Sequence, residues 1–250
     1  MVVHTSADQL YNPTTLQLFD MKYKHLFFDL DHTLWDFDRN SAECLVEIFD
    51  TYRLADVGIT SSEEFSRHFI TINRKLWADY DKNLIEHTYI RQHRFPLVFQ
   101  ALGIDPALVQ ADLNAEYLKL LPRKPHLLES AREVLDYLNG RYTMHIITNG
   151  FAEIQAVKMD SAEIAHYFTN VITSENANAK KPDPLVFQYA LNSSEATATE
   201  SLMIGDNYEA DILGAKRAGL DTLFYNIHGL EVADQPTYNI RHWRELLAIL

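Results

Sequence analysis

The stretch KHLFFDLDHTLWDF, residues 24–37, decides the fold. It opens with an apolar run typical of a short buried strand ending at Leu30, and two aspartates, Asp29 and Asp31, stand at the end of that run. Carboxylates this close together repel each other, and neither belongs inside an apolar core unless something compensates its charge. We therefore expect a charged site where a buried strand ends.

The second half of the chain alternates between helices and short apolar strands. Strands are predicted to begin at Tyr142, Val171 and Ser201, and the run DTLFYN, residues 221–226, is predicted to be the last strand. Helical segments separate these strands. This alternation is typical of an α/β fold, here a doubly wound, Rossmann-like parallel sheet with helices on both faces.

Between the first strand and this region, the sequence has helical periodicity only. One helix is predicted from Asn40, with Asn40 or Ser41 as its cap, and the last one covers residues 106–121. Two prolines in LPRKP, residues 121–125, then break the pattern. The predicted parts of the chain are an N-terminal extension over residues 1–20, a core over residues 21–38 and 122–250, and an inserted all-helical cap domain over residues 39–121.

The composition is that of an ordinary globular protein with an acidic surface. Hydrophobic residues make up 47% of the chain, and the formal net charge is -13. Such a surface repels a phosphate backbone, so polymeric nucleic acid is not expected as a partner. No apolar run has the length of a membrane span, and the single cysteine, Cys44, fits a reducing compartment. We expect a cytoplasmic protein, in which residues 1–20 are no signal peptide but a disordered extension or a misassigned start.

Polar residues follow each of the first four predicted strands. Ligands of a parallel sheet gather outside the carboxyl ends of its strands, so we expect these residues to meet at one edge. Each of them alone has an ordinary explanation as a helix cap, a turn or a solvated side chain, but the complete set in this order favours a site. The residues are Asp29 and Asp31 after the first strand, Thr148 and Asn149 after the second, Lys181 after the third, and Asp206 and Asp211 after the fourth.

The chemistry of this set points to a metal ion and a phosphate group. Several carboxylates at one edge are unstable without a divalent cation, and carboxylate oxygens suit Mg²⁺. Magnesium commonly partners a phosphate, whose remaining oxygens Lys181 and Thr148 can bind. One aspartate can then attack the phosphorus. The second, with a raised pKa, can protonate the leaving group and afterwards activate water.

Four segments resemble the motifs of the haloacid dehalogenase-like hydrolase superfamily. They are DLDHT from Asp29, IITNG from Ile146, KKPDP from Lys180 and IGDNYEAD from Ile204. The resemblance implies that Asp29 is the nucleophile and Asp31 the general acid and base. It implies a phosphate site of Thr148, Lys181 and Asn149. It further implies that Mg²⁺ is held by Asp29, the backbone carbonyl of Asp31 and Asp206, with Asp211 in support.

A second resemblance concerns the substrate. The segments NRKLWADYDKNLIEHTYIRQHRF, ITNGFAEIQAVK and ADILGAKRAGLDT are similar to parts of bacterial 5'-nucleotidases that favour non-standard pyrimidine nucleotides. This implies a small phosphate monoester, a nucleoside 5'-monophosphate, as the substrate of a monomer or homodimer. A phosphatase for sugar or sugar-acid phosphates is the nearest alternative. A haloacid dehalogenase, a phosphosugar mutase and a phospho-receiver switch are further ones, although dehalogenases of this type lack an aspartate at the position of Asp31.

The predicted cap contains aromatic and basic residues that can be assigned in two ways. Trp77 and Tyr80 can stack on a base, but at helical spacing we favour a place in the core of the cap. Arg91, His93 and Arg94 can face the cleft, but we favour a solvated helix face.

Overall fold

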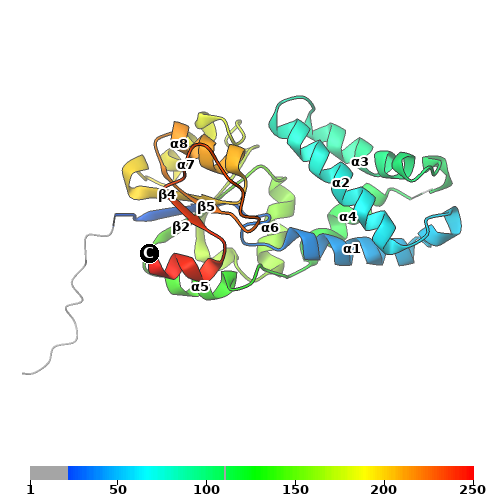
Figure 1. The fold of residues 1–250 in the computed structure, drawn as a ribbon, viewed down its shortest axis with the longest axis horizontal. Coiled ribbons are helices and arrows are strands. Elements are labelled where there is room, and N and C mark those ends of the chain that lie inside the picture. Colours follow the sequence, from blue (N-terminus) through cyan, green and yellow to red (C-terminus); the bar gives the residue numbers. More distant parts are fainter. Residues whose placement is uncertain (1–21, 110) are drawn as a thin grey trace, which may run out of the picture.

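The computed structural model describes residues 22–109 and 111–250, and the predicted extension over residues 1–20 lies outside them. The described chain forms a parallel sheet with covering helices and a group of helices beside it (Figure 1). The strands are β1 His25–Phe28, β2 Thr143–Thr148, β3 Phe168–Thr173, β4 Ser201–Gly205, β5 Asp221–Tyr225 and β6 Tyr238–Ile240.

The sheet has the order β3-β2-β1-β4-β5-β6, and every neighbouring pair is parallel. The central strand β1 therefore has β2 on one side and β4 on the other, so residues that follow these three strands come together. The prediction that residues 221–226 form the last strand is wrong, because β6 adds an edge strand. Only three residues long, β6 is too short to give a periodic signal in the sequence.

The two faces of the sheet are covered by different helices. Phe28 and Ile204 point to a core that includes α5 and Trp243, whereas Phe27 and Met203 point to a core that includes α7 and α8. Neighbouring strand residues alternate between faces, and both faces are buried, so these strands read as continuous apolar runs. The predicted doubly wound α/β sheet is confirmed.

Helices separate the first five strands along the described chain, whereas β5 and β6 follow each other without a helix between them. The bounds of the helices are α1 Phe37–Thr51, α2 Ser62–Asp81, α3 His87–Ala101, α4 Leu113–Leu120, α5 Ala131–Leu138, α6 Ala152–Ser161, α7 Pro184–Ser193 and α8 Gly214–Arg217. A π-helical turn, Tyr208–Leu213, precedes α8 directly.

Two helix ends differ from the prediction. The helix α1 begins at Phe37, because the Asp36 carboxylate accepts a hydrogen bond from the backbone N–H of Arg39 and caps it. Asn40 and Ser41, which were expected as caps, are buried inside the helix. The predicted helix over residues 106–121 is two short ones, since the side chain of Asp112 caps a new start at α4.

Helices α1 to α4 lie together beside the sheet and form what we call the helical lobe (Figure 1). Within it α2 packs against α1 and α3, and α4 packs against α1 and α3. The aromatic rings of Phe65, Phe69, Phe95 and Tyr117 are buried there. The boundaries of a separate cap domain at residues 39 and 121 stay a prediction. Across residues 22–109 and 111–250, none of the helices has the length and apolar character needed to span a membrane.

Candidate active site

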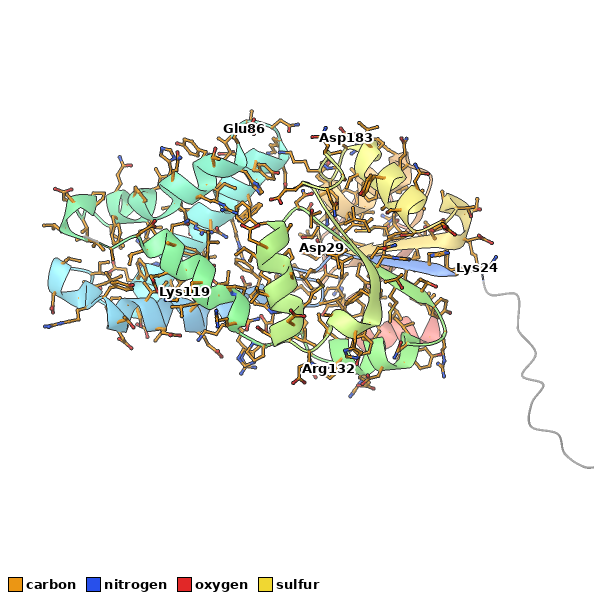
Figure 2. All side chains as sticks on the ribbon, turned by 180° about the vertical axis from the view of Figure 1, so that it is seen from behind. Lys24, Asp29, Glu86, Lys119, Arg132 and Asp183 are labelled. Carbon is orange, nitrogen blue, oxygen red and sulfur yellow. The ribbon has the colours of Figure 1, made fainter. Side chains whose placement is uncertain are left out.

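Asp29 lies at the centre of the molecule, at the end of β1. Its backbone N–H donates to the carbonyl of Ile204 (2.9 Å), so the strand pairing with β4 continues to this residue. Figure 2 shows Asp29 between the helical lobe and the sheet, with Lys24 at the opposite end of β1. The strand thus delivers a carboxylate, only 8% exposed, to the carboxyl edge of the sheet.

Three carboxylates converge at this edge, and one lysine accompanies them. Oxygen atoms of Asp29, Asp206 and Asp211 all lie within 4.8 Å of one another. The ammonium of Lys181 is 2.6 Å from Asp29 Oδ1 and 2.6 Å from Asp211 Oδ1. Burial raises the pKa of Asp29 to about 6 although Lys181 opposes the shift, and burial also raises the pKa values of Asp206 and Asp211.

This donor set fits a divalent cation. Three carboxylates, two of them buried and that of Asp206 partly exposed, leave excess negative charge beside a single ammonium. All the converging ligand atoms are oxygens, as Mg²⁺ prefers. The group of Asp29, Asp206 and Asp211 contains no nitrogen or sulfur ligand, which a softer metal would favour.

Neighbouring residues hold the carboxylates of Asp206 and Asp211 in place. The hydroxyl of Thr33 donates to Asp206 Oδ1 and accepts from the backbone N–H of Asp206, both at 3.1 Å. The backbone N–H of Asn207 donates to Asp211 Oδ2 (3.0 Å). Thr33, two residues beyond Asp31, thereby ties the β1 loop to the β4 loop.

Gly205 makes the approach of Asp211 possible. A Cβ atom at residue 205 would lie 2.2 Å from Asp211 Oδ2 and 2.4 Å from its Cγ. We expect Gly205→Ala to displace the Asp211 carboxylate and to lower the free energy of unfolding by about 1–3 kcal/mol, the usual cost of overpacking. Denaturant unfolding of the two proteins checks this. An unchanged midpoint, with activity unchanged, would show that Asp211 can move away without consequence.

Thr148 is the last residue of β2, and Asn149 follows it directly. The Thr148 hydroxyl accepts from Gln155 Nε2 (2.7 Å), on α6. The Asn149 amide donates to the carbonyl of Lys181 (2.9 Å), and its oxygen accepts from the Lys181 N–H (2.9 Å). Asn149 also donates to Asp81, in the helical lobe, at 3.1 Å. These bonds fix the loop that carries Lys181, and whether Asn149 also binds phosphate stays a prediction.

Asp31 lies apart from the three clustered carboxylates and has its own partners. Lys158 donates to Asp31 Oδ1 at 2.6 Å, and Gln155 donates to Oδ2 at 2.9 Å. Burial raises the pKa of Asp31, but the Lys158 ammonium outweighs it and holds the pKa below its usual value. The raised pKa that the sequence suggested for this residue is therefore wrong, because a cation from α6 faces it.

Gln155 and Lys158 were missed by the sequence reasoning. Both are buried, although α6 is otherwise an ordinary short helix after a turn. The available signal was their spacing of three residues, which places two polar side chains on one helix face, in a helix that directly follows a site motif.

A cavity of about 290 Å³ lies over the site, between the sheet edge and the helical lobe. All seven predicted site residues line it, and the lobe contributes Asn73, Trp77, Asp81, Arg94 and Tyr117 among others. Tyr80, in contrast, is 7% exposed and packs edge-to-face on Trp77 (5.7 Å between ring centroids). Tyr80 therefore belongs to the core of the lobe as predicted. Trp77, for which the same place was expected, is only partly buried and lines the cavity.

The three basic residues of α3 have different surroundings. His93 and Arg91 are both partly exposed, and the guanidinium of Arg91 is 2.5 Å from Glu153 on α6. Arg94 is only 2% exposed, so the solvated helix face expected for it is wrong. The α3 sequence alternates polar and apolar residues too irregularly to show which side faces inward.

The sequence and the fold were compared with known proteins. Residues 26–225 match the family of haloacid dehalogenase-like hydrolases. The pyrimidine 5'-nucleotidase PynA of Streptococcus pneumoniae is 32% identical, covering 92% of this chain and 96% of the relative. The pyrimidine 5'-nucleotidase YjjG of Escherichia coli is 30% identical, covering 92% and 99%.

One more distant relative and one solved structure also align along most of this chain. A glyceraldehyde 3-phosphate phosphatase of Pyrococcus abyssi is 28% identical, covering 81% of each chain. The crystal structure of the HAD-hydrolase YfnB from Bacillus subtilis, bound to magnesium, aligns with a TM-score of 0.80 at 28% identity, covering 91% of this chain and 98% of that one. With four motifs at one sheet edge and a family match over most of its length, the chain belongs to the haloacid dehalogenase-like hydrolase family.

Proposed function

We propose that the protein is a magnesium-dependent phosphomonoesterase that acts through an aspartyl phosphate on Asp29. The observation that carries the proposal is the placement of two aspartates after β1. Asp29 belongs to the acidic cluster and contacts Lys181. Asp31, two residues further along the chain, contacts Lys158 and Gln155 instead. This separation supports different roles: Asp29 would serve the cation and the phosphate, and Asp31 would exchange protons with the leaving group and with water.

The reaction has two steps. In the first, an Asp29 oxygen forms a bond to phosphorus, the bond between phosphorus and the leaving-group oxygen breaks, and Asp31 supplies a proton to that oxygen. In the second, a water molecule attacks the phosphorus of the aspartyl phosphate while Asp31 takes its proton. Asp29 leaves as a carboxylate, and inorganic phosphate is released. The pKa of Asp31, held low by Lys158, suits the second step, in which it is the base.

Magnesium would be held by Asp29, the backbone carbonyl of Asp31 and Asp206, with Asp211 in support. When bound, the ion would supply positive charge to the phosphate oxygens. Lys181 and Thr148 would bind the same oxygens from the other strands. Burial lowers the pKa of Lys181, but the carboxylates of Asp29 and Asp211 outweigh it and raise the pKa, so Lys181 stays charged.

Magnesium binding should be visible as a gain in stability. Because the ion binds the folded chain, millimolar MgCl₂ should raise the melting temperature, by about 2–4 °C for a gain of 1 kcal/mol in a chain of this size. Asp206→Asn removes one ligand and should abolish the shift. Glu209→Gln changes an exposed acid three residues after Asp206 that is outside the cluster, and this variant should keep the shift. A shift of equal size in all three proteins would mean that the ion binds elsewhere.

The helical lobe would act as a cap over the site. Three contacts join the lobe to the core: Arg91 with Glu153, Asp81 with Asn149, and Lys180 with the ring of Tyr80, 3.3 Å from its centroid. A lobe seated in this way excludes water from the phosphate and contacts the leaving group.

The substrate we propose is a nucleoside 5'-monophosphate with a pyrimidine base. Relatives with this activity in their names align along nearly the whole chain, and the cavity offers aromatic side chains such as Trp77 and Phe151 to a flat group. A sugar-phosphate phosphatase is the alternative that more distant relatives favour. We further propose that the enzyme works in the cytoplasm, as a monomer or homodimer.

Phosphate release from a panel of nucleoside 5'-monophosphates and sugar phosphates, with Mg²⁺, tests the substrate class. A preference for pyrimidine nucleotides is the expected result. Activity confined to sugar phosphates would keep the mechanism and replace the substrate. No phosphate release from any member would contradict the proposed function.

A further inference from the structure

Arg94 is a buried cation without an anionic partner. It lies on α3, is 2% exposed, and forms no ion pair with any carboxylate of the described residues. Nη1 donates to Asn73 Oδ1 (3.2 Å) and Nη2 to Asn114 Oδ1 (2.6 Å), both neutral amides. Its Nε finds no hydrogen-bond partner in the structure. The guanidinium has five N–H donors, so donors remain available.

This arrangement is costly for a residue that serves packing alone. Burial lowers the pKa of Arg94 to about 10, which shows that its charge is poorly compensated. The ring centroids of Tyr117, Phe69 and Phe95 lie 4.5, 5.4 and 5.9 Å from the guanidinium carbon. The faces of these rings attract the cation but only partly replace the water that hydrates an exposed guanidinium. An unpaired buried donor that persists calls for a ligand that completes it.

The cavity connects Arg94 with the reaction site. Arg94, Asn73 and Tyr117 line the same cavity as Asp29 and Lys181. A phosphate ester whose phosphorus lies at Asp29 can therefore extend its leaving group toward Arg94 within this cavity. A guanidinium donates hydrogen bonds and accepts none, so it selects an oxygen acceptor at that end of the leaving group.

We propose that Arg94 is a specificity-determining residue that binds an acceptor oxygen of the leaving group, with Asn73 and Asn114 holding its plane in orientation. The inference rests on the proposed phosphatase function and deepens it. Two leaving groups offer the required oxygen: a pyrimidine base through a ring carbonyl, and a sugar acid through its carboxylate.

The test compares substrates with and without such an oxygen. Uridine 5'-monophosphate carries ring carbonyls, 2-phosphoglycolate carries a carboxylate, and phenyl phosphate carries neither. Arg94→Met removes the donors while keeping an unbranched side chain. We expect it to lower kcat/KM roughly 30-fold or more for one of the two oxygen-bearing substrates, as for loss of a buried charged hydrogen bond, and to leave phenyl phosphate within about threefold. The substrate that loses most identifies the source of the oxygen.

A matched control and a second readout separate recognition from folding. Arg67→Met removes the same charge from the exposed surface of α2 and should change none of the three rates. Melting temperature with and without uridine, the dephosphorylated product, reports binding without any reaction: a shift in the wild type that Arg94→Met abolishes supports a base carbonyl. If Arg94→Met fails to fold, Arg94→Lys keeps the charge but loses the planar fork, and the same selective loss is expected at a smaller size.

The outcomes are distinct. Equal losses for all three substrates in a folded Arg94 variant would assign it a purely structural role and overturn the inference. A wild type that hydrolyses phenyl phosphate as well as the other two would leave the phosphatase standing and also overturn the inference. A wild type that hydrolyses none of them would contradict the proposed function before any variant is measured.

Discussion

Asp29→Asn should lower the rate of phosphate release by at least about 10,000-fold, the scale of removing an enzyme's nucleophile. The amide has nearly the shape of the carboxylate but is a poor nucleophile, so no covalent intermediate forms. The fold should survive. The substitution removes one of three mutually repelling carboxylates, and Lys181 keeps Asp211 as its partner at 2.6 Å. Steady-state phosphate release measures the loss of activity, and the melting temperature checks that the protein is folded.

The control for this substitution is the same change at an exposed aspartate. Asp160 lies on the surface of α6 and faces solvent, so Asp160→Asn should retain full activity. An Asp29→Asn protein that still turns over at a tenth of the wild-type rate would show that another group attacks the phosphorus.

Asp31→Asn should have an effect that depends on the leaving group. An alkyl alcohol leaves poorly unless it receives a proton, whereas p-nitrophenolate needs none. Loss of proton transfer by a placed side chain typically costs 10²–10⁴-fold. We therefore expect kcat/KM, which reports the first step, to fall by roughly this size for a nucleotide and by clearly less for p-nitrophenyl phosphate. A series of phenyl phosphates with graded substituents measures this dependence. The same loss across the series would remove Asp31 from proton transfer to the leaving group.

Lys158 offers a second variant that acts on the same carboxylate. Its ammonium holds the pKa of Asp31 low and fixes one of its oxygens. Lys158→Met leaves the Asp31 carboxylate in place and keeps its bond to Gln155. Comparing the leaving-group dependence of Lys158→Met with that of Asp31→Asn distinguishes two requirements: that the Asp31 carboxylate is present, and that Lys158 holds it in position.

The sheet and its site were predictable because both depend on local sequence. Each central strand is a continuous apolar run that ends in a polar motif, and parallel strands place such ends at one edge. Asp29, Thr148, Lys181 and Asp206 could thus be brought together without a structure. The four motifs also pointed to the family, which the match over residues 26–225 confirms.

The parts that could not be predicted depend on contacts between distant segments. Lys158 contacts Asp31 across 127 positions of sequence, and Arg94 on α3 contacts Asn114 on α4. Neither contact has a local signal in the sequence. The pKa of Asp31 was misjudged for the same reason. Burial can be expected from a strand end, but the cation that reverses its effect comes from α6.

The central claim is a covalent phosphoryl group on Asp29, and trapping it is the most direct test. p-Nitrophenyl phosphate, whose leaving group needs no proton, is mixed with Mg²⁺ and the Asp31→Asn protein, in which the water step is slowed, and acid quench is followed by peptide mass spectrometry. We predict one added phosphoryl group on the peptide that contains Asp29, absent from the Asp29→Asn protein. Phosphate release in the wild type without any such adduct, or an adduct on another residue, would contradict the account.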